Sequence, residues 1–139
     1  LINKKKMINA AYLSGCSINI TKTTAPHALS YSLTSIFNVA HGHAVASLLA
    51  PTALITYELS DSEQKQTMID IFKLFGCNDI LEFQAKWLLL MKLCDLDSKL
   101  TKYHIETKVV VSGVNIERMK NHPVELSLEN IECIVEAVV

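Results

Sequence analysis

The chain has 139 residues, which is the length of one domain. Half of its residues are hydrophobic and 19% are charged, a composition that excludes disordered and fibrous proteins. The net charge of −1 excludes the basic surface on which nucleic-acid binding depends. The apolar share is high for a free monomer of this size. We therefore expect one domain over residues 1–139 with an apolar face that a partner covers.

The longest apolar stretch, residues 44–55, is shorter than the 18 or more residues that a membrane-spanning helix needs. We expect no membrane segment and no targeting signal, and hence a cytoplasmic protein. The sequence begins with Leu1, and no secretion signal precedes the first periodic segment. These features predict that the chain is the C-terminal piece of a longer protein. Four cysteines without a CxxC pair are predicted to be small buried residues in a reducing compartment: Cys16, Cys77, Cys94 and Cys133.

Helical periodicity begins close to the N-terminus. A first helix is expected over residues 4–14, because one of its faces carries Met7, Ile8, Ala11 and Tyr12. Thr24 can cap a second helix, and Pro26 lies in its first turn, where the missing N–H of proline costs little. This second helix should end near Phe37.

A break over residues 38–40 separates the second helix from a third, expected from His41 to Leu59 with a kink or restart at Pro51. Ser60 stands three residues before Glu63 and predicts a capping box for a fourth helix, which should end at Gly76. Its inward side chains should be Met68, Ile71, Phe72 and Phe75.

A fifth helix should follow a cap at Asn78 or Asp79. Its buried stripe is predicted to contain Ile80, Phe83, Trp87, Leu90 and Met91. Three further helical segments are expected over residues 98–105, 116–120 and 127–138, with Ser127 as a cap for the last. Only Val109–Val111 has β-like character. The predicted fold class is all-α: an antiparallel bundle of five to eight helices joined by short loops.

Three of the five histidines lie within seventeen residues: His27, His41 and His43. His27 lies in the first turns of the second helix and His41 opens the third, so they can meet only if the third helix crosses steeply or an extended linker returns the chain. Spacing alone leaves this open. Residues i and i+2 of a helix point about 200° apart, so at most one of His41 and His43 can bind a given ion. His104 and His122 have polar neighbours and are expected on the surface.

Two imidazoles are an incomplete ligand set, because catalytic metal sites generally use three or more protein ligands. No Asp or Glu precedes Glu58, so any further ligands must come from outside this chain. We therefore expect the chain alone to bind metal weakly or not at all. Tyr31 lies one helical turn after His27 and shares its face. It could hydrogen-bond near a group that His27 holds, or it could be an ordinary half-buried tyrosine.

Residues 15–51, which contain the strings KTTAPHALSY and HGHAV, resemble the iron-containing (group III) alcohol dehydrogenases. The similarity is strongest to the phosphonoacetaldehyde reductase branch. The matching pattern is His27, then His41–Gly42 fourteen residues later, then a small-residue helix and Pro51. Residues 121–126, Asn-His-Pro-Val-Glu-Leu, are similar to a segment near the end of that family.

The resemblance implies the helical C-terminal domain of a dehydroquinate synthase-like fold, preceded in the family by a domain that binds NAD(P)H. It also implies a divalent metal, Fe²⁺ or Zn²⁺, held by one aspartate and three histidines. Two of those ligands carry over to His27 and His41, and the other two precede this chain in the family's order. Tyr31 stands where many members have another histidine, so no acid–base role follows for it. Ala40 replaces a common proline.

The implied reaction is metal- and NAD(P)-dependent conversion between an alcohol and an aldehyde, with a phosphonate aldehyde as the candidate substrate. Four substrate contacts are predicted before the first ligand, where a helix N-terminus can attract an anion: Asn19, Lys22, Thr23 and Thr24. Tyr31, one helical turn after His27, is the fifth candidate.

Two alternatives stay open. One is a truncated relative that serves, without catalysis, as a helical binding or oligomerisation module. The other is a stand-alone helical metal-binding protein, which would need at least one further ligand. The full enzyme is also expected to be able to form a homo-oligomer.

Overall fold

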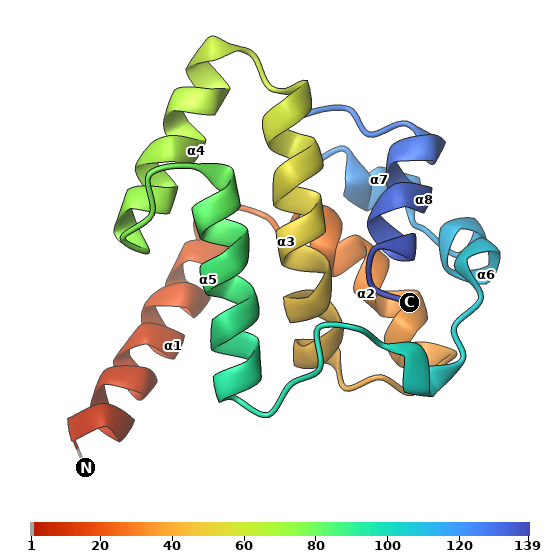
Figure 1. Cartoon of the computed structure of the whole chain (residues 1–139), viewed down its shortest axis with the longest axis horizontal. Helices are drawn as coiled ribbons and strands as arrows, with labels where there is room; N and C mark the ends of the chain where they lie inside the picture. Colours follow the sequence, from red (N-terminus) through yellow and green to blue (C-terminus); the bar gives the residue numbers. More distant parts are fainter. Residues whose placement is uncertain (1) are drawn as a thin grey trace.

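A computed structural model describes residues 2–139, with side chains from residue 3 onward, and contains helices and connecting segments but no strand over that range (Figure 1). The helices are α1 (Ile2–Ile20), α2 (Ala25–Ser35), α3 (His41–Leu59), α4 (Ser62–Leu74), α5 (Ile80–Leu93), α6 (Thr107–Ser112), α7 (Ile116–Met119) and α8 (Leu128–Glu136), with one 3₁₀ turn, η1 (Thr101–Tyr103). The all-α prediction is confirmed.

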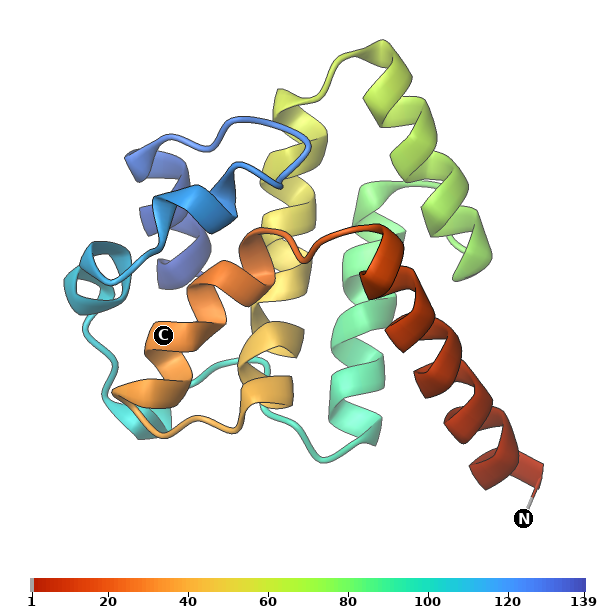
Figure 2. The same cartoon turned by 180° about the vertical axis from the view of Figure 1, so that it is seen from behind.

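Helix α3 runs through the middle of the fold. Helices α4 and α5 pack on one side of it, and α2 and α8 pack on the other, with α6 and α7 beyond them (Figure 1). Helix α1 packs against no other helix of the described chain, and Figure 2 shows it projecting away from the rest. No described helix has the length and apolar composition needed to cross a bilayer.

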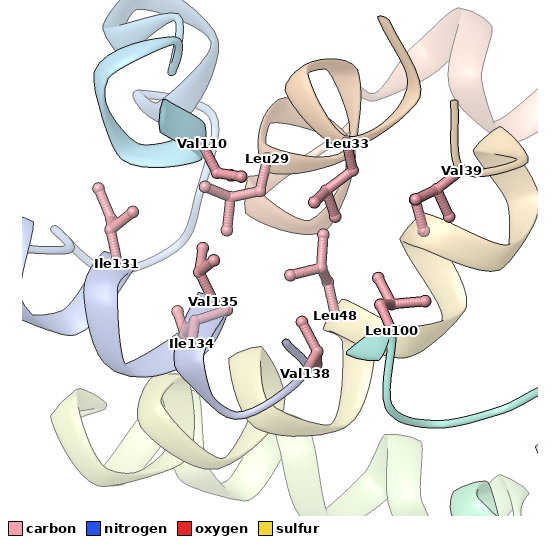
Figure 3. Close-up of a cluster of buried hydrophobic side chains, with 11 residues drawn as sticks. Leu29, Leu33, Val39, Leu48, Leu100, Val110, Ile131, Ile134, Val135 and Val138 are labelled. Carbon is pink, nitrogen blue, oxygen red and sulfur yellow. The ribbon is translucent and has the colours of Figure 1, made fainter. Parts of the chain in front are cut away.

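The larger core lies between α2, α3, α6 and α8 (Figure 3). Leu29 and Leu33 of α2 meet Leu48 of α3, and all three side chains are completely buried. Truncating a buried leucine of this kind to alanine typically costs about 2–5 kcal/mol. This core fixes α2 against α3 and so sets the relative position of the residues at their N-terminal ends.

A smaller core joins α4 and α5 to α3. The rings of Phe72 and Phe83 stack there with their centroids 4.8 Å apart. The predicted inward faces are only partly correct, because Ile71, Phe75 and Leu90 are between 42% and 46% exposed. Among the described helices, α4 and α5 pack only on α3 and on each other, so the outer parts of both apolar stripes stay uncovered.

The helix caps follow the predictions except at α4, where the cap is one residue later than predicted. Asp79 and Ser127 cap α5 and α8 as expected, and each side chain accepts from the backbone N–H three residues later. Helix α4 is capped by Asp61 rather than Ser60, in a capping box with Gln64. The Ser60 hydroxyl instead donates to the Thr56 carbonyl, 2.7 Å away, so Ser60 terminates α3.

Several predicted boundaries change. Helix α1 is longer than residues 4–14, and its expected inward face is exposed, with Met7, Ile8 and Tyr12 between 68% and 71% accessible. Helix α2 ends at Ser35, before Phe37. Helix α3 continues through Pro51 without a restart.

The region after α5 differs most from the sequence-based prediction. Residues 98–105 form only η1 rather than a full helix. The β-like Val109–Val111 lies in α6, because burial of Val110 in the larger core outweighs local β propensity. Among the cysteines only Cys77 is buried. Cys16 is partly exposed, and Cys94 and Cys133 are exposed, so the burial prediction is wrong for these three.

Candidate metal site

His27 and His41 come together although fourteen residues separate them. Their ring centroids are 5.5 Å apart, and the ring planes are inclined by 65°. His27 lies in the first turn of α2, and His41 is the first residue of α3. The sequence left this convergence open, and the structure shows it.

The linker over residues 36–40 makes the convergence possible. Asn38 adopts a left-handed backbone conformation with φ of 55°, which asparagine tolerates better than most residues. The next residue, Val39, donates its backbone N–H to the Leu33 carbonyl, 3.1 Å away, and buries its side chain in the larger core. The chain therefore turns back along α2 and returns His41 toward His27.

Ser30 orients the His41 ring. The Ser30 hydroxyl donates to the His27 carbonyl at 2.8 Å, and its oxygen lies 3.3 Å from His41 Nδ1. Because the single hydroxyl proton is already used, the oxygen can only accept from His41. This favours the Nδ1–H tautomer and leaves the lone pair of Nε2 available for a ligand. Such partners of metal-binding histidines fix both ring orientation and tautomer.

Tyr31 covers one face of the His41 ring. The two rings stack with centroids 5.8 Å apart and planes 27° from parallel. The guanidinium of Arg118, on α7, lies over the Tyr31 ring, 4.4 Å from its centroid. Three side chains from three helices are thus layered beside His27.

The two histidines differ in solvent exposure. His41 is exposed and His27 is partly buried. Desolvation by burial, and secondarily the neighbouring His41, lower the pKa of His27 below its usual value. Both causes favour a neutral His27 imidazole, which is the form that binds a metal ion.

His43 is directed elsewhere, as the i, i+2 geometry requires. It is buried, and its Nε2 donates to the Asp97 carbonyl, 2.6 Å away. His104 is exposed as predicted. The surface prediction for His122 is wrong, because this ring is partly buried and its Nε2 is 2.9 Å from Thr56 Oγ1.

Four of the five predicted substrate-binding residues lie at the end of α1 and in the connection to α2, and the fifth, Tyr31, lies in α2. Asn19 and Lys22 are exposed, and Thr23 and Thr24 are partly buried. Thr24 is the N-cap residue of α2, but its side chain makes no capping hydrogen bond. Pro26 has no N–H and the His27 N–H is bonded to the Thr24 carbonyl, so this helix end offers few free backbone donors to an anion.

The donor set fits part of a metal site. Two imidazoles this close can present one nitrogen each to a single divalent ion, for which metal–nitrogen distances are about 2.0–2.1 Å with zinc. No group of three or more His, Cys, Asp or Glu side chains suited to a metal occurs in the described part of the chain. His27 and His41 therefore supply at most two ligands.

Two residues at the site were not predicted from the sequence. Ser30 lies three residues after His27, a spacing that places it on the same helix face and could have drawn attention to it. Arg118 lies 87 residues after Tyr31, and no local pattern connects the two. Only the packing of α7 against α2 brings them together.

Comparisons with known proteins agree with this fold. The profile described as Fe-containing alcohol dehydrogenase family, C-terminal, matches residues 2–139. A similar solved structure is the archaeal halo-thermophilic Red Sea brine pool alcohol dehydrogenase ADH/D1 bound to NZQ, with a TM-score of 0.75 and 21% sequence identity.

That similarity covers 88% of this chain but only 34% of the solved chain, so this chain spans about a third of that relative. No curated protein matches the present chain. Because the family profile covers almost the whole sequence, the chain belongs to the Fe-containing alcohol dehydrogenase family, of which it represents the C-terminal part.

Proposed function

We propose that this chain is the helical part of a metal- and NAD(P)-dependent alcohol dehydrogenase or aldehyde reductase. The observation that carries the proposal is the approach of His27 and His41 to 5.5 Å across the returning linker. Family membership supports the same reaction class. Under this proposal, the NAD(P)H-binding part and the remaining metal ligands come from a second, nucleotide-binding domain.

In the proposed site His27 and His41 hold a divalent ion, Fe²⁺ or Zn²⁺, through one ring nitrogen each. When bound, such an ion supplies Lewis acidity toward the oxygen of an aldehyde or alcohol. Ser30 favours the Nδ1–H tautomer of the neutral His41 ring, and Tyr31 packs on the ring and shields one of its faces. The chain thereby contributes metal ligation and orientation, while hydride transfer belongs to the nicotinamide cofactor.

We further propose that the substrate is a phosphonate aldehyde such as phosphonoacetaldehyde. The proposal is supported by the position of residues 22–24, which lead directly into the helix that carries His27. Asn19, at the end of α1, and Tyr31 complete the proposed substrate contacts. A cationic Lys22 would offset part of the phosphonate charge.

The metal role is tested with His27→Ala and His41→Ala in the complete enzyme. Each variant should lose bound metal and NAD(P)H-dependent aldehyde reduction together, because each removes one of the ligands. His104→Asn is the matched control, since His104 is exposed and remote in sequence from both rings. Wild-type metal content in both alanine variants would refute the assignment.

The substrate role of Lys22 is tested by Lys22→Ala. This change should raise KM for phosphonoacetaldehyde more than KM for acetaldehyde, because only the first substrate carries an anionic group. Lys4→Ala, at the other end of α1, serves as the control. Equal changes for the two aldehydes would remove Lys22 from the substrate site.

A non-catalytic role as a binding or oligomerisation module is the second candidate. It is favoured by the exposed apolar side chains of α1 and by the exposed leucines of α5, Leu81, Leu88, Leu89, Leu90 and Leu93. Under this alternative the chain should self-associate in a concentration-dependent way and should bind no metal, which sedimentation and metal analysis of the same sample would distinguish.

A further inference from the structure

The one arginine of the chain lies at the candidate site. Arg118 is on α7, which packs against α2, and its guanidinium carbon is 4.4 Å from the centre of the Tyr31 ring. Tyr31 in turn stacks on His41. The Tyr31 ring therefore lies between the permanent cation of Arg118 and His41, a proposed metal ligand.

The hydrogen-bond donors of Arg118 have no partner in the described chain. The ion pairs there are Lys73–Asp70, Lys102–Asp97 and Lys120–Glu117, and no hydrogen bond involves the Arg118 side chain. On α7 itself, Glu117 pairs with Lys120 at 2.7 Å rather than with the arginine between them. Stacking occupies a face of the guanidinium, while its five N–H donors lie along the edge and stay available.

The surroundings favour an anion. The first 57 residues, which include α2, the linker and the start of α3, contain neither Asp nor Glu. The side chains that α2, the linker and the start of α3 place around the two histidines are therefore neutral or cationic, and the carboxylate nearest in sequence to Arg118, Glu117, is paired with Lys120. An anionic ligand arriving here meets Arg118 and no competing carboxylate from those elements.

We propose that Arg118 binds the anionic group of the substrate and sets the preference of the enzyme for charged aldehydes. The shared chemistry is an oxyanion with two oxygens that can accept from the guanidinium edge, as in a phosphonate or a carboxylate. Tyr31 is the platform that holds the guanidinium in place. The inference rests on the proposed function, because it takes the His27–His41 pair as the place where the aldehyde reacts.

The test uses Arg118→Gln and Arg118→Lys in the complete enzyme, with Lys120→Gln on the same helix as the control. KM is measured for phosphonoacetaldehyde, for glyoxylate and for acetaldehyde. Arg118→Gln should raise KM for an anionic aldehyde by about 10- to 100-fold, the range expected for losing hydrogen bonds to a charged group. It should leave KM for acetaldehyde unchanged. Arg118→Lys should restore part of the affinity.

The two anionic substrates separate the two sources of the oxyanion, since the one that Arg118→Gln weakens more is the one that the site recognises. A KM increase of the same size for acetaldehyde, or no increase for either anion, would overturn the proposal. A similar increase in Lys120→Gln would also overturn it, because this would show a general charge effect.

A second readout does not depend on turnover. Methylphosphonate binding to the same proteins is followed by isothermal titration calorimetry without nicotinamide. If the wild type binds methylphosphonate and Arg118→Gln binds it at least about tenfold more weakly, the proposal stands even when no aldehyde is reduced. If the wild type does not bind it, or Arg118→Gln binds it equally well, Arg118 is not the anion-binding residue.

Discussion

The imidazole of His122 donates its Nε2 proton to the hydroxyl oxygen of Thr56, 2.9 Å away and 66 residues earlier in the chain. The Thr56 hydroxyl proton is itself donated to the Thr52 carbonyl at 2.6 Å, so the oxygen can only accept from His122. This contact ties the segment after α7 to the end of α3. The other ring nitrogen, Nδ1, is buried without a partner among the described residues.

The partly buried His122 ring predicts acid sensitivity of the fold. Desolvation lowers the pKa of His122 from 6.5 to about 4. Between pH 6.5 and 4, His122 binds a proton in the unfolded chain but stays neutral in the folded chain. The free energy of unfolding therefore falls as the pH is lowered from 6.5 toward 4. Urea denaturation at a series of pH values measures this loss.

The His122 contribution is isolated by comparison with a variant. In His122→Gln the free energy of unfolding should fall less between pH 6.5 and 4. The difference from the wild type is the part of the loss that comes from protonation of His122 in the unfolded chain. The lowered pKa of His27 acts in the same direction and remains in both proteins, so it cancels in the difference. His104→Gln should keep the wild-type dependence, and identical curves for wild type and His122→Gln would contradict the prediction.

Replacing Ser30 by alanine should loosen the orientation of His41. Without the accepting hydroxyl, Nδ1 has no fixed partner, and the proton can occupy either nitrogen. Metal affinity of the complete enzyme should fall by about 10- to 100-fold, as is typical when a partner of a metal-binding histidine is removed.

Nitrogen-15 NMR of the His41 ring provides a readout without metal, and it should change from Nδ1–H alone to a mixture of tautomers. Ser35→Ala, at the exposed end of the same helix, is the control. An unchanged tautomer in Ser30→Ala would show that another group orients His41.

Gly113 lets α6 approach α2 closely. A Cβ atom at this position would lie 2.5 Å from Ser32 Oγ but 3.5 Å from Ser32 Cβ. Gly113→Ala should therefore destabilise the fold by about 1–3 kcal/mol, the usual cost of overpacking. The double variant with Ser32→Ala should recover much of that loss, because the atom that clashes is gone.

Gly15→Ala is the matched control for Gly113→Ala. Nothing lies within 4 Å of a Cβ at position 15, and this residue is in the middle of α1. The change should raise helix content with a gain of about 1 kcal/mol in helix propensity. Thermal denaturation by circular dichroism compares the three variants, and a neutral Gly113→Ala would contradict the close approach.

Trp87 connects α5 to α3 through its indole N–H, which donates to the Ala46 carbonyl at 2.8 Å. Trp87→Phe keeps most of the apolar volume but removes the donor, so stability should fall by about 1 kcal/mol. Urea unfolding followed by circular dichroism measures the change. Gln84→Ala removes a longer contact to the same helix, 3.3 Å from the Ala50 carbonyl, and should cost less.

The 139-residue chain alone should bind Zn²⁺ weakly, because the described residues contain no group of three or more His, Cys, Asp or Glu side chains suited to a metal, and the proposed ligands are the pair His27 and His41. Calorimetric titration of the chain should show weak binding that His27→Ala abolishes. Stoichiometric zinc that survives dialysis would show that the chain carries a complete site.

The helices could be predicted where local rules decide them. Asp79 and Ser127 have the side chains and following sequence that helix caps require, and both are caps. Ser60 and Asp61 are adjacent and both can cap, and the choice depends on Ser60 bonding back into α3. The β-like interpretation of Val109–Val111 is wrong for a different reason. The segment is helical because Val110 is buried by tertiary packing, and not because of its local propensity.

The candidate site could also be predicted only in part. Histidine is a chemically distinctive residue, so His27 and His41 could be selected from the sequence. Their approach depends on the turn at Asn38 and on burial of Val39, neither of which has a strong sequence signal. Arg118 reaches Tyr31 through packing of distant segments, which no local pattern encodes.

Helix α1 packs on no other described helix, yet only residues 21–24 separate it from the helix that carries His27. A linker this short transmits direction as well as position. Any surface that immobilises α1 therefore also constrains the direction in which the segment with Lys22, Thr23 and Thr24 enters α2. Under the proposed function, contacts along the outer face of α1, far from the histidines, would then govern substrate selectivity, and changes there should alter which aldehydes react while every group at the candidate site stays the same.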